Sequence, residues 1–426
     1  MTRLRRLSLL SIALLFLSHA ACAVEGRVMD SKTGAAISEA TVTVGDHAVL
    51  TDGSGHFEIE GDGETILARA PGYRAGSWAV GSPGTPAEIL RLDPFVPKAL
   101  YLSVYGIGSK TLRNGALRLA KDGSINALVI DIKGDRGLLP YPSTIPLAKM
   151  DGARTLTTIP DLASMVKELH SEGIYAIARI VVFKDTPLAT SRPDLAVKRS
   201  NGQLFRDREG LAWTDPFQPE VRDYNLAIAV EAARAGFDEV QFDYVRFPDA
   251  AGQLRFAQVP TEAMRVKAIQ TFLLDARKEL LPFNVNLSVD IFGYVCWNTN
   301  DTGIGQQLES MIQAVDYISP MLYPSCFQCG IPGYRDSVAF PYEIVHDTLE
   351  HAEGRLHVSP KRFRPWLQAF RDYAFDRRLF GSDQVKAQTR AASDFGSDGW
   401  MLWNPHNKYG DLGLGSESAP GPTLGH

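Results

Sequence analysis

Several features that mark other protein classes are missing from this sequence. It has no block of basic residues, and its formal net charge of −5 is spread along 426 residues, which argues against a nucleic-acid partner. It contains no HExxH pair, no GxSxG serine elbow and no glycine-rich phosphate loop after a strand pattern. Its histidines do not recur at metal-ligand spacing, so we expect neither a bound metal nor a cofactor.

An apolar run near the N-terminus has the layout of a secretory signal. A basic start, MTRLRR, precedes the apolar LSLLSIALLFL, and Ala21-Cys22-Ala23 forms a small-x-small cleavage pattern, which predicts a signal peptide over residues 1–23. This run is too short to span a bilayer, and no later segment reaches that length. We therefore expect a periplasmic or secreted protein whose mature form has no transmembrane segment. Lipoprotein anchoring through Cys22 is the less favoured alternative, because His19 stands where a lipobox prefers Leu.

Cysteines are few in the rest of the chain. Once the signal is removed, only Cys296, Cys326 and Cys329 remain. The stretch SCFQCG could close a small disulfide in an oxidising compartment or keep two free thiols, with Cys296 left free. One CxxC without a second pair or a flanking histidine lacks the ligands of a zinc site.

Residues 24–95 have the pattern of a small all-β domain. Short alternating runs such as ATVTV and GHFEIEG are separated by turn signals such as Asp-Gly and Pro-Gly. The order GRVMDSKTGAAISEATVTV, TDGSGHFEI and APGY resembles a carboxypeptidase regulatory-like domain over nearly the whole segment. That resemblance implies an Ig-like β-sandwich, which usually serves as an accessory module.

From about residue 98 the pattern changes to strands that alternate with amphipathic helices. Helices are expected in TIPDLASMVKELHSEG, TEAMRVKAIQTFLLDARKEL, GIGQQLESMIQAV and SDQVKAQTRAASDFG. The strand runs are ALYLSVY, NALVIDI, YAIARIVVF, FDEVQFDYV, VNLSVDIF, DYISPMLY, PWLQAF and GWMLW. Eight such units in residues 98–408 predict an α/β fold, a (β/α)8 TIM barrel. The Gly-, Ser- and Pro-rich residues 409–426 are expected to be a disordered tail.

Alternation within the strand runs predicts which side chains face the barrel interior. Apolar positions such as Val240 and Phe242 face the helices, which turns Asp243 inward at the C-terminal end of its strand. The inward positions are then Asp131, Arg179, Gln241, Asp243, Asn286, Ser288, Asp290, Ser319, Met321, Tyr323, Trp366, Gln368, Met401 and Trp403. Because buried polar groups need partners, the polar members could alternatively form a hydrogen-bonded core in which Arg179 neutralises an aspartate.

Asp243 and Asp290 are the candidate catalytic residues. They end neighbouring strands, which lie ~4.8 Å apart, so their carboxyl groups could stand roughly 5–9 Å from each other. That separation suits glycoside hydrolysis, in which one carboxyl protonates the leaving oxygen and the other attacks or activates water. Aromatic residues that could stack on sugar rings concentrate at the same end. The candidate substrate-binding residues are Asp131, Arg179, Arg246, Tyr323, Gln368 and Trp403.

Two of these candidates have simpler interpretations. Arg246 could form an ordinary salt bridge. Asp131 and Asp135 in DIKGDRG could bind a cation, although Lys133 and Arg136 balance their charge and favour a solvated loop.

The barrel segment also carries a family resemblance. ALVIDIKGDRG, IARIVVFKD, GFDEVQFDYVRFP, SVDIFGY and YISPMLYPS resemble an uncharacterised bacterial family of glycoside hydrolases that is distantly related to the α-amylase superfamily. The likeness spans about residues 98–408 and implies a TIM barrel that acts on a polysaccharide, with Asp243 at the position of the α-amylase-type nucleophile. The sequence departs from that superfamily in two places: Asp290 stands where it has a glutamate acid/base, and Gln368 replaces its strand-seven His-Asp pair.

The leading hypothesis is an exported glycoside hydrolase with a carbohydrate substrate, in which Asp243 acts as nucleophile or base and Asp290 as acid. The rival is a non-catalytic glycan-binding protein on a degenerate barrel. The missing strand-seven carboxylate and the β-rich appendage would fit that rival as well. The two differ at one residue, because a hydrolase cannot lose Asp243, whereas a binder could retain affinity after Asp243→Asn.

Overall fold

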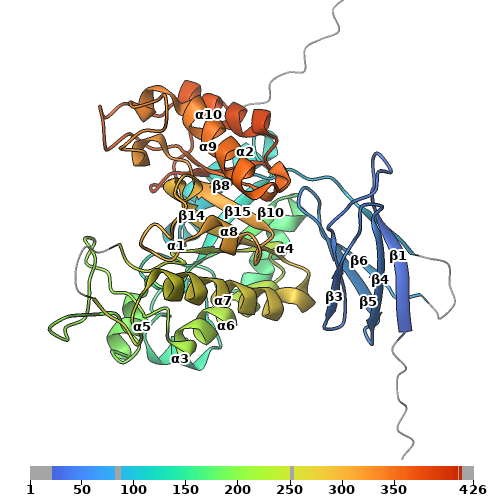
Figure 1. Cartoon of the computed structure of the whole chain (residues 1–426), viewed down its shortest axis with the longest axis horizontal. Coiled ribbons are helices and arrows are strands. Elements are labelled where there is room, and N and C mark those ends of the chain that lie inside the picture. Colours follow the sequence, from blue (N-terminus) through green and yellow to red (C-terminus); the bar gives the residue numbers. More distant parts are fainter. Residues whose placement is uncertain (1–21, 82–87, 250–253, 411, 415–426) are drawn as a thin grey trace, which may run out of the picture.

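The computed structural model describes residues 22–81, 88–249, 254–410 and 412–414. Most of the signal peptide expected over residues 1–23 and most of the tail expected over 409–426 lie outside these ranges. Figure 1 shows a small group of N-terminal strands beside a larger barrel with surrounding helices. Tyr409 still packs on the barrel, where its hydroxyl donates to the Tyr101 carbonyl at 2.8 Å. Among the described residues, no helix is both long and apolar enough to cross a membrane.

The N-terminal part contains two sheets, with strand orders β4-β1-β7 and β3-β2-β5-β6. Alternate residues of these strands, such as Val28, Val42, Phe57 and Ile66, are buried in a core of their own. This confirms the all-β character predicted from the sequence, while the likeness to a carboxypeptidase regulatory-like, Ig-like domain stays a prediction. The strands are β1 Cys22–Asp30, β2 Thr41–Val44, β3 His47–Leu50, β4 His56–Gly61, β5 Thr65–Arg69, β6 Gly76–Ala79 and β7 Glu88–Leu92.

The larger part is a closed barrel of parallel strands, as the sequence predicts. Its order around the barrel is β8-β9-β10-β12-β14-β15-β16-β17, and each strand pairs with its neighbours in parallel. All eight predicted strand runs are present. The strands are β8 Lys98–Leu102, β9 Ala127–Lys133, β10 Tyr175–Val181, β12 Glu239–Asp243, β14 Asn286–Phe292, β15 Tyr317–Met321, β16 Trp366–Gln368 and β17 Trp400–Trp403.

Helices cover the outside of the barrel (Figure 1). In α4, Asp161 caps the first turn with its carboxylate, and Leu162, Val166 and Leu169 bury one face against the strands. The α-helices are α1 Val104–Gly108, α2 Lys110–Lys121, α3 Pro146–Met150, α4 Leu162–Ser171, α5 Thr186–Ser191, α6 Pro219–Arg234, α7 Glu262–Leu280, α8 Leu308–Met311, α9 Pro341–Leu356 and α10 Ser382–Phe395. The 3₁₀ turns are η1 Leu281–Phe283, η2 Gly293–Cys296, η3 Pro324–Cys326, η4 Ser337–Ala339 and η5 Pro360–Arg362, and a short pair of strands, β11 Lys198–Arg199 and β13 Leu254–Arg255, lies outside the barrel.

One predicted helix is much shorter than expected. GIGQQLESMIQAV forms only the single turn α8, because its first residues make a loop in which Gly303 and Gly305 have φ of 74° and 85°. Asp301 stabilises this loop by accepting hydrogen bonds from both glycine N–H groups at 2.9 Å. A Cβ at Gly305 would lie 3.1 Å from the Phe247 side chain. The glycine therefore lets the loop pack closely against the segment that follows β12.

Two separate hydrophobic layers confirm the predicted strand alternation. Val240 and Phe242 belong to the large cluster between strands and helices. Tyr101, Trp366 and Met401 belong to a smaller cluster inside the barrel. The interior therefore presents aromatic and polar side chains together with a few aliphatic ones such as Val129 and Ile177, and most aliphatic side chains face the helices.

The N-terminal sheets contact the barrel at the end where its strands begin. Arg69 Nε lies 3.4 Å from Oδ2 of Asp316, which immediately precedes β15. Asn284, which precedes β14, donates its amide to the Gly76 carbonyl at 2.9 Å. Active sites of such barrels lie at the opposite, C-terminal end. The N-terminal part therefore lies beside the base of the barrel and contributes no residue to the mouth cavity described below.

Candidate active site

Arg179 on β10 holds the candidate site together, with only 1% of its side chain exposed. Its Nη1 donates to Asp131 Oδ1 at 2.6 Å, and its Nε donates to Asp243 Oδ2 at 3.0 Å. Its Nη2 donates to Asp135 Oδ1 at 3.0 Å and also to Asp243. The same Nε lies 4.0 Å from Asp290 Oδ2. One buried guanidinium therefore faces four carboxyl groups.

The barrel register explains how these groups meet. Arg179 lies level with Asp131 on β9 and with Gln241 on β12, so that Asp243 stands one inward position closer to the mouth. Asp290 comes from β14, the strand beyond β12. The mutual placement of Asp131, Arg179, Asp243 and Asp290 thus follows from strand order and alternation.

Asp243 ends β12 at a sharp turn of the backbone. Its Oδ1 accepts a hydrogen bond from the backbone N–H of Tyr244 at 2.6 Å. Tyr244 has a φ of 51°, in the left-handed region that bulky residues rarely adopt. Such backbone conformations need support from their surroundings and cluster at functional sites. Here the Lys184 ammonium lies 4.7 Å from the centre of the Tyr244 ring. The turn holds both the Asp243 carboxylate and the Tyr244 ring in the cavity wall.

Asp290 lies deeper than Asp243, with 1% of its surface exposed. Its Oδ1 accepts a hydrogen bond from Trp366 Nε1 at 2.8 Å, whereas its Oδ2 is buried without a hydrogen-bond partner among the described residues. Burial and the Asp243 carboxylate raise the pKa of Asp290 well above its usual value, against the opposing effect of Arg179. Asp290 therefore takes up a proton more readily than an ordinary aspartate does.

A cavity of about 410 Å³ opens above these residues at the C-terminal ends of the strands. That volume suits a small ligand or a few sugar units. On one side of it, the Trp403 ring stacks on Tyr101 with centroids 3.9 Å apart. The residues that line the cavity are Asp135, Arg179, Lys184, Phe205, Arg206, Asp207, Arg208, Glu209, Trp213, Asp243, Tyr244, Arg246, Pro248, Asp249, Phe292, Met321, Tyr323, Trp366 and Trp403.

Most of the residues predicted to bind substrate lie at this cavity. Arg179, Arg246, Tyr323 and Trp403 line it, as does the predicted catalytic Asp243. Their roles in substrate binding stay predictions.

Three other predicted residues lie elsewhere. Asp131 accepts the Tyr101 hydroxyl at 2.7 Å and lines a smaller neighbouring cavity of about 210 Å³. Asp290 lies beneath the main cavity and does not line it. Gln368 is fully buried, and its amide donates to Ser325 Oγ at 2.7 Å, so it supports the loop after β15.

Most of one wall of the cavity was not identified from the sequence. It comes from the long segment between β10 and α6, where Lys184 forms ion pairs with Glu209 at 2.7 Å and Asp207 at 3.4 Å. Asp207 also accepts the Trp213 indole N–H at 3.0 Å. Figure 1 shows these yellow-green loops on the opposite side of the molecule from the blue N-terminal strands. The alternating charges of FRDREG were the available signal, but they have no strand or helix periodicity that places them at the mouth.

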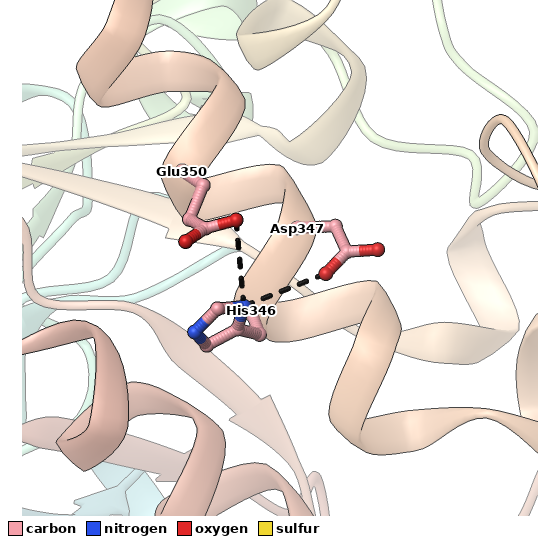
Figure 2. A group of neighbouring side chains, drawn as sticks. All are labelled: His346, Asp347 and Glu350. Carbon is pink, nitrogen blue, oxygen red and sulfur yellow. Dashed lines mark ion pairs between the residues drawn. The ribbon is translucent and has the colours of Figure 1, made fainter.

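The cysteines and the most compact set of potential metal ligands both lie outside this cavity. Cys296, Cys326 and Cys329 are free thiols. Figure 2 shows His346 between Asp347 and Glu350, with Nδ1 at 3.4 and 3.7 Å from their carboxylate oxygens. All three residues are on α9, where His346 and Glu350 have the i,i+4 spacing of an ordinary side-chain pair on a helix surface.

Comparison with known proteins establishes the class of this chain. Residues 99–409 match the model of a family described as "Putative glycosyl hydrolase domain", and the chain belongs to this family. No curated protein matches the chain.

Two solved structures show the nature of the structural likeness. The glycoside hydrolase domain of PgaB (BpsB) from Bordetella bronchiseptica aligns with 73% of this chain and 95% of its own length, at 13% identity and a TM-score of 0.54. A hypothetical protein from Ruminiclostridium thermocellum is 38% identical and covers 45% of this chain and 96% of its own length, with a TM-score of 0.40. The likeness to PgaB supports the barrel fold.

Proposed function

We propose that this protein is an exported glycoside hydrolase that cleaves a poly- or oligosaccharide in the mouth cavity. The single observation that carries this proposal is the placement of two carboxyl groups around Arg179. Asp243 Oδ2 and Asp290 Oδ2 lie 3.0 and 4.0 Å from the same Nε atom. These two oxygens are therefore at most about 7 Å apart, which is below the upper limit of the roughly 5–9.5 Å that separates the carboxyl groups of glycosidases.

The environments of the two carboxyl groups suit different roles. Asp243 faces the cavity and is held by the Arg179 guanidinium, so we assign it as the nucleophile or as the base that activates water. Burial and the neighbouring Asp243 carboxylate raise the pKa of Asp290, so we assign it as the acid. To reach a leaving oxygen, Asp290 needs the Trp366 indole to move from its hydrogen bond, because Asp290 does not line the cavity.

Asp135 is the alternative proton source. It shares Arg179 Nη2 with Asp243, its side chain is 37% exposed, and it lines the cavity. It could reach a sugar oxygen without movement of Trp366. Asp135 follows β9, whereas Asp290 is on β14, so the two candidate acids come from opposite sides of the strand that carries Arg179.

The aromatic surfaces support a carbohydrate substrate. Trp403 and Trp366 meet edge to face with ring centroids 5.5 Å apart, and both line the cavity. Arg179 lies 5.0 Å from the Trp403 ring centre, on the side of the carboxylates. A sugar that stacks on such a ring would bring its polar edge toward the charged floor.

The test is release of reducing ends from a panel of bacterial and plant polysaccharides. Wild type would be compared with Asp243→Asn, Asp290→Asn and Asp135→Asn, with thermal melting as the folding control. We expect Asp243→Asn and one of the other two variants to lose release while remaining folded. Equal glycan binding by all four proteins with no cleavage by any would instead identify a non-catalytic glycan-binding barrel.

Export and the role of the N-terminal part belong to the same proposal. The N-terminal sheets contact the base of the barrel near Asp316, so they would act as an attachment or spacer at the end away from the cavity. Fractionation of cells that express the full chain would test export. Retention of the unprocessed chain in the cytoplasm would contradict it.

A further inference from the structure

Arg246 differs from the other basic residues of the cavity. Its guanidinium lies between three aromatic rings, 4.8 Å from the centre of Trp213, 4.8 Å from Phe292 and 5.2 Å from Tyr244. Nη1 donates to the Phe247 carbonyl at 3.1 Å. Among the described residues, no carboxylate lies within ion-pair distance of Arg246, and its remaining N–H groups have no hydrogen-bond partner.

The other charges of the cavity are distributed unevenly. Arg179 is paired with Asp131, Asp135 and Asp243. Lys184 is paired with Asp207 and Glu209.

Most acidic residues that line the cavity therefore form an ion pair, whereas several of the basic residues do not. Arg206 and Arg208 line the same cavity, and within the described ranges neither has an ion-pair partner. Arg206 donates only to the Gly210 carbonyl, at 2.8 Å. On the acidic side, Asp249 alone of the lining carboxylates has no cationic partner in the described chain. Outside the clusters around Arg179 and Lys184, the charged lining residues without an ion pair are therefore mainly arginines.

Aromatic rings around a guanidinium make up for only part of the hydration that the charge loses on burial. Cation–π contacts are electrostatic and use the charge of the guanidinium, so the N–H donors in the guanidinium plane remain free to bond a ligand. An arginine remains charged and presents a planar fork that matches a carboxylate. The rings around Arg246 also fix the direction of that fork, since they leave it little room to move.

We infer that Arg246 forms an anion subsite, and that the glycan cleaved in this cavity carries acidic sugars whose carboxylate binds the Arg246 fork. This inference rests on the proposed function, because it names the substrate class of the same cavity. A uronic acid has a sugar ring for the Trp403 side and a carboxylate for the Arg246 side. Arg206 and Arg208 at the rim add positive charge that would attract such a polymer.

The test compares acidic polymers with neutral polymers of the same linkage. Polygalacturonate, alginate and hyaluronan would each be tested beside their carboxyl-reduced forms, in which the carboxylate becomes a primary alcohol. A sulfated galactan and its desulfated form would show whether a sulfate ester serves in place of the carboxylate. Binding of the full chain would be measured by calorimetry, independently of cleavage.

Three variants give the comparison its controls. Arg246→Gln removes the charge, Arg246→Lys keeps the charge without the fork, and Arg118→Gln removes one charge from the outer helix α2. We expect wild type and Arg118→Gln to bind at least one acidic polymer about 10- to 100-fold more tightly than its neutral form. Arg246→Gln should lose that preference with unchanged binding of the neutral form, and Arg246→Lys should keep part of it. Thermal melting would confirm that each variant is folded.

The outcomes separate this inference from the proposed function. Binding with the expected preference but no release of reducing ends would support the subsite and contradict the hydrolase. Cleavage of neutral polymers alone would support the hydrolase and overturn the subsite. An acidic preference that survives Arg246→Gln, or a failure to bind any acidic polymer, would also overturn the subsite.

Discussion

Two buried arginines occupy opposite ends of the same barrel. Arg364 lies at the base, before β16, where it forms ion pairs with Glu239 and Asp398, the latter at 2.7 Å. Ser288 donates its hydroxyl to Glu239 at 2.6 Å, and the Arg364 guanidinium lies 4.0 Å from the centre of the Tyr317 ring. Two carboxylates share one guanidinium there, and the group has no outlet to the mouth cavity.

Arg179 at the mouth is surrounded by more negative charge than it can neutralise. Four carboxyl groups lie within 4.0 Å of it, and two of them, Asp135 and Asp243, line the cavity. Burial raises the pKa of Asp131 to about 6, with Arg179 opposing the shift and Asp135 adding to it. Buried charge is expensive unless paired. The base cluster, in which two buried carboxylates bond one guanidinium away from the cavity, is therefore structural. The mouth cluster, with four carboxyl groups around one guanidinium and two of them open to the cavity, is the kind of arrangement that active sites use.

The largest effect should come from Asp243→Asn. If the mouth cluster is catalytic, this change removes the nucleophile or base and should lower kcat by at least roughly 10³-fold. The free energy of unfolding should fall only moderately: the amide N–H group replaces one oxygen that accepts a hydrogen bond from Arg179 or Tyr244, but the carboxamide is isosteric and Arg179 keeps three other carboxyl neighbours. Reducing-end release and urea unfolding would be measured on the same preparation. Retained activity would show that the mouth cluster is as structural as the base.

At the base of the barrel, Glu239→Ala should reduce stability rather than activity. It leaves the Arg364 guanidinium with one carboxylate in a fully buried setting, and Ser288 and Tyr175 lose an acceptor. We expect the free energy of unfolding to fall by about 3–5 kcal/mol. The activity of the folded fraction should fall far less than in Asp243→Asn. A double variant that also carries Arg364→Met should recover part of the stability, and a loss below about 1 kcal/mol in the single variant would contradict a structural role.

The difference between the two clusters also shows what the sequence could reveal. Strand alternation and helix spacing were enough to predict the barrel, because Val240 and Phe242 pack on helices in the way that such alternation requires. The same alternation turned Asp243 and Asp290 inward, and strand order brought them around Arg179.

The directions of side chains in loops and at strand ends could not be predicted from strand alternation. Arg364 precedes its strand and Lys184 follows its own, so neither occupies a position whose direction is set by alternation. Gln368 is turned inward, yet a hydrogen bond to Ser325 takes its amide away from the cavity, and only tertiary contacts decide that. The helix expected in GIGQQLESMIQAV was shortened because Gly303 and Gly305 adopt positive φ in a loop that bonds the Asp301 carboxylate, and helix spacing does not predict that loop.

A third prediction concerns the effect of pH on the mouth cluster. Because the pKa of Asp131 is raised from 3.8 to about 6, the folded protein holds this proton more tightly than the unfolded chain. The contribution of Asp131 to stability therefore falls as pH rises from about 4 to about 6, by up to roughly 3 kcal/mol. Asp131→Asn should remove this dependence, so the variant gains stability relative to wild type over that interval. Urea unfolding at several pH values would measure the difference, and parallel pH profiles for the two proteins would contradict it.

The smallest change in the free energy of unfolding is expected from Asp135→Asn. This variant removes a charge from the mouth cluster at a position that is not fully buried. Asp135 bonds the same guanidinium as Asp243 at 3.0 Å, but its side chain is 37% exposed, whereas the Glu239 side chain at the base is fully buried. Water and salt screen an exposed ion pair, so the change should alter the free energy of unfolding by less than about 1 kcal/mol. Urea unfolding beside Glu239→Gln provides the comparison at matched chemistry, since each change converts a carboxylate that bonds a buried arginine into its amide. A loss above about 2 kcal/mol would mean that the excess carboxylates at the mouth stabilise the fold, and the contrast between the two ends of the barrel would then rest on position alone.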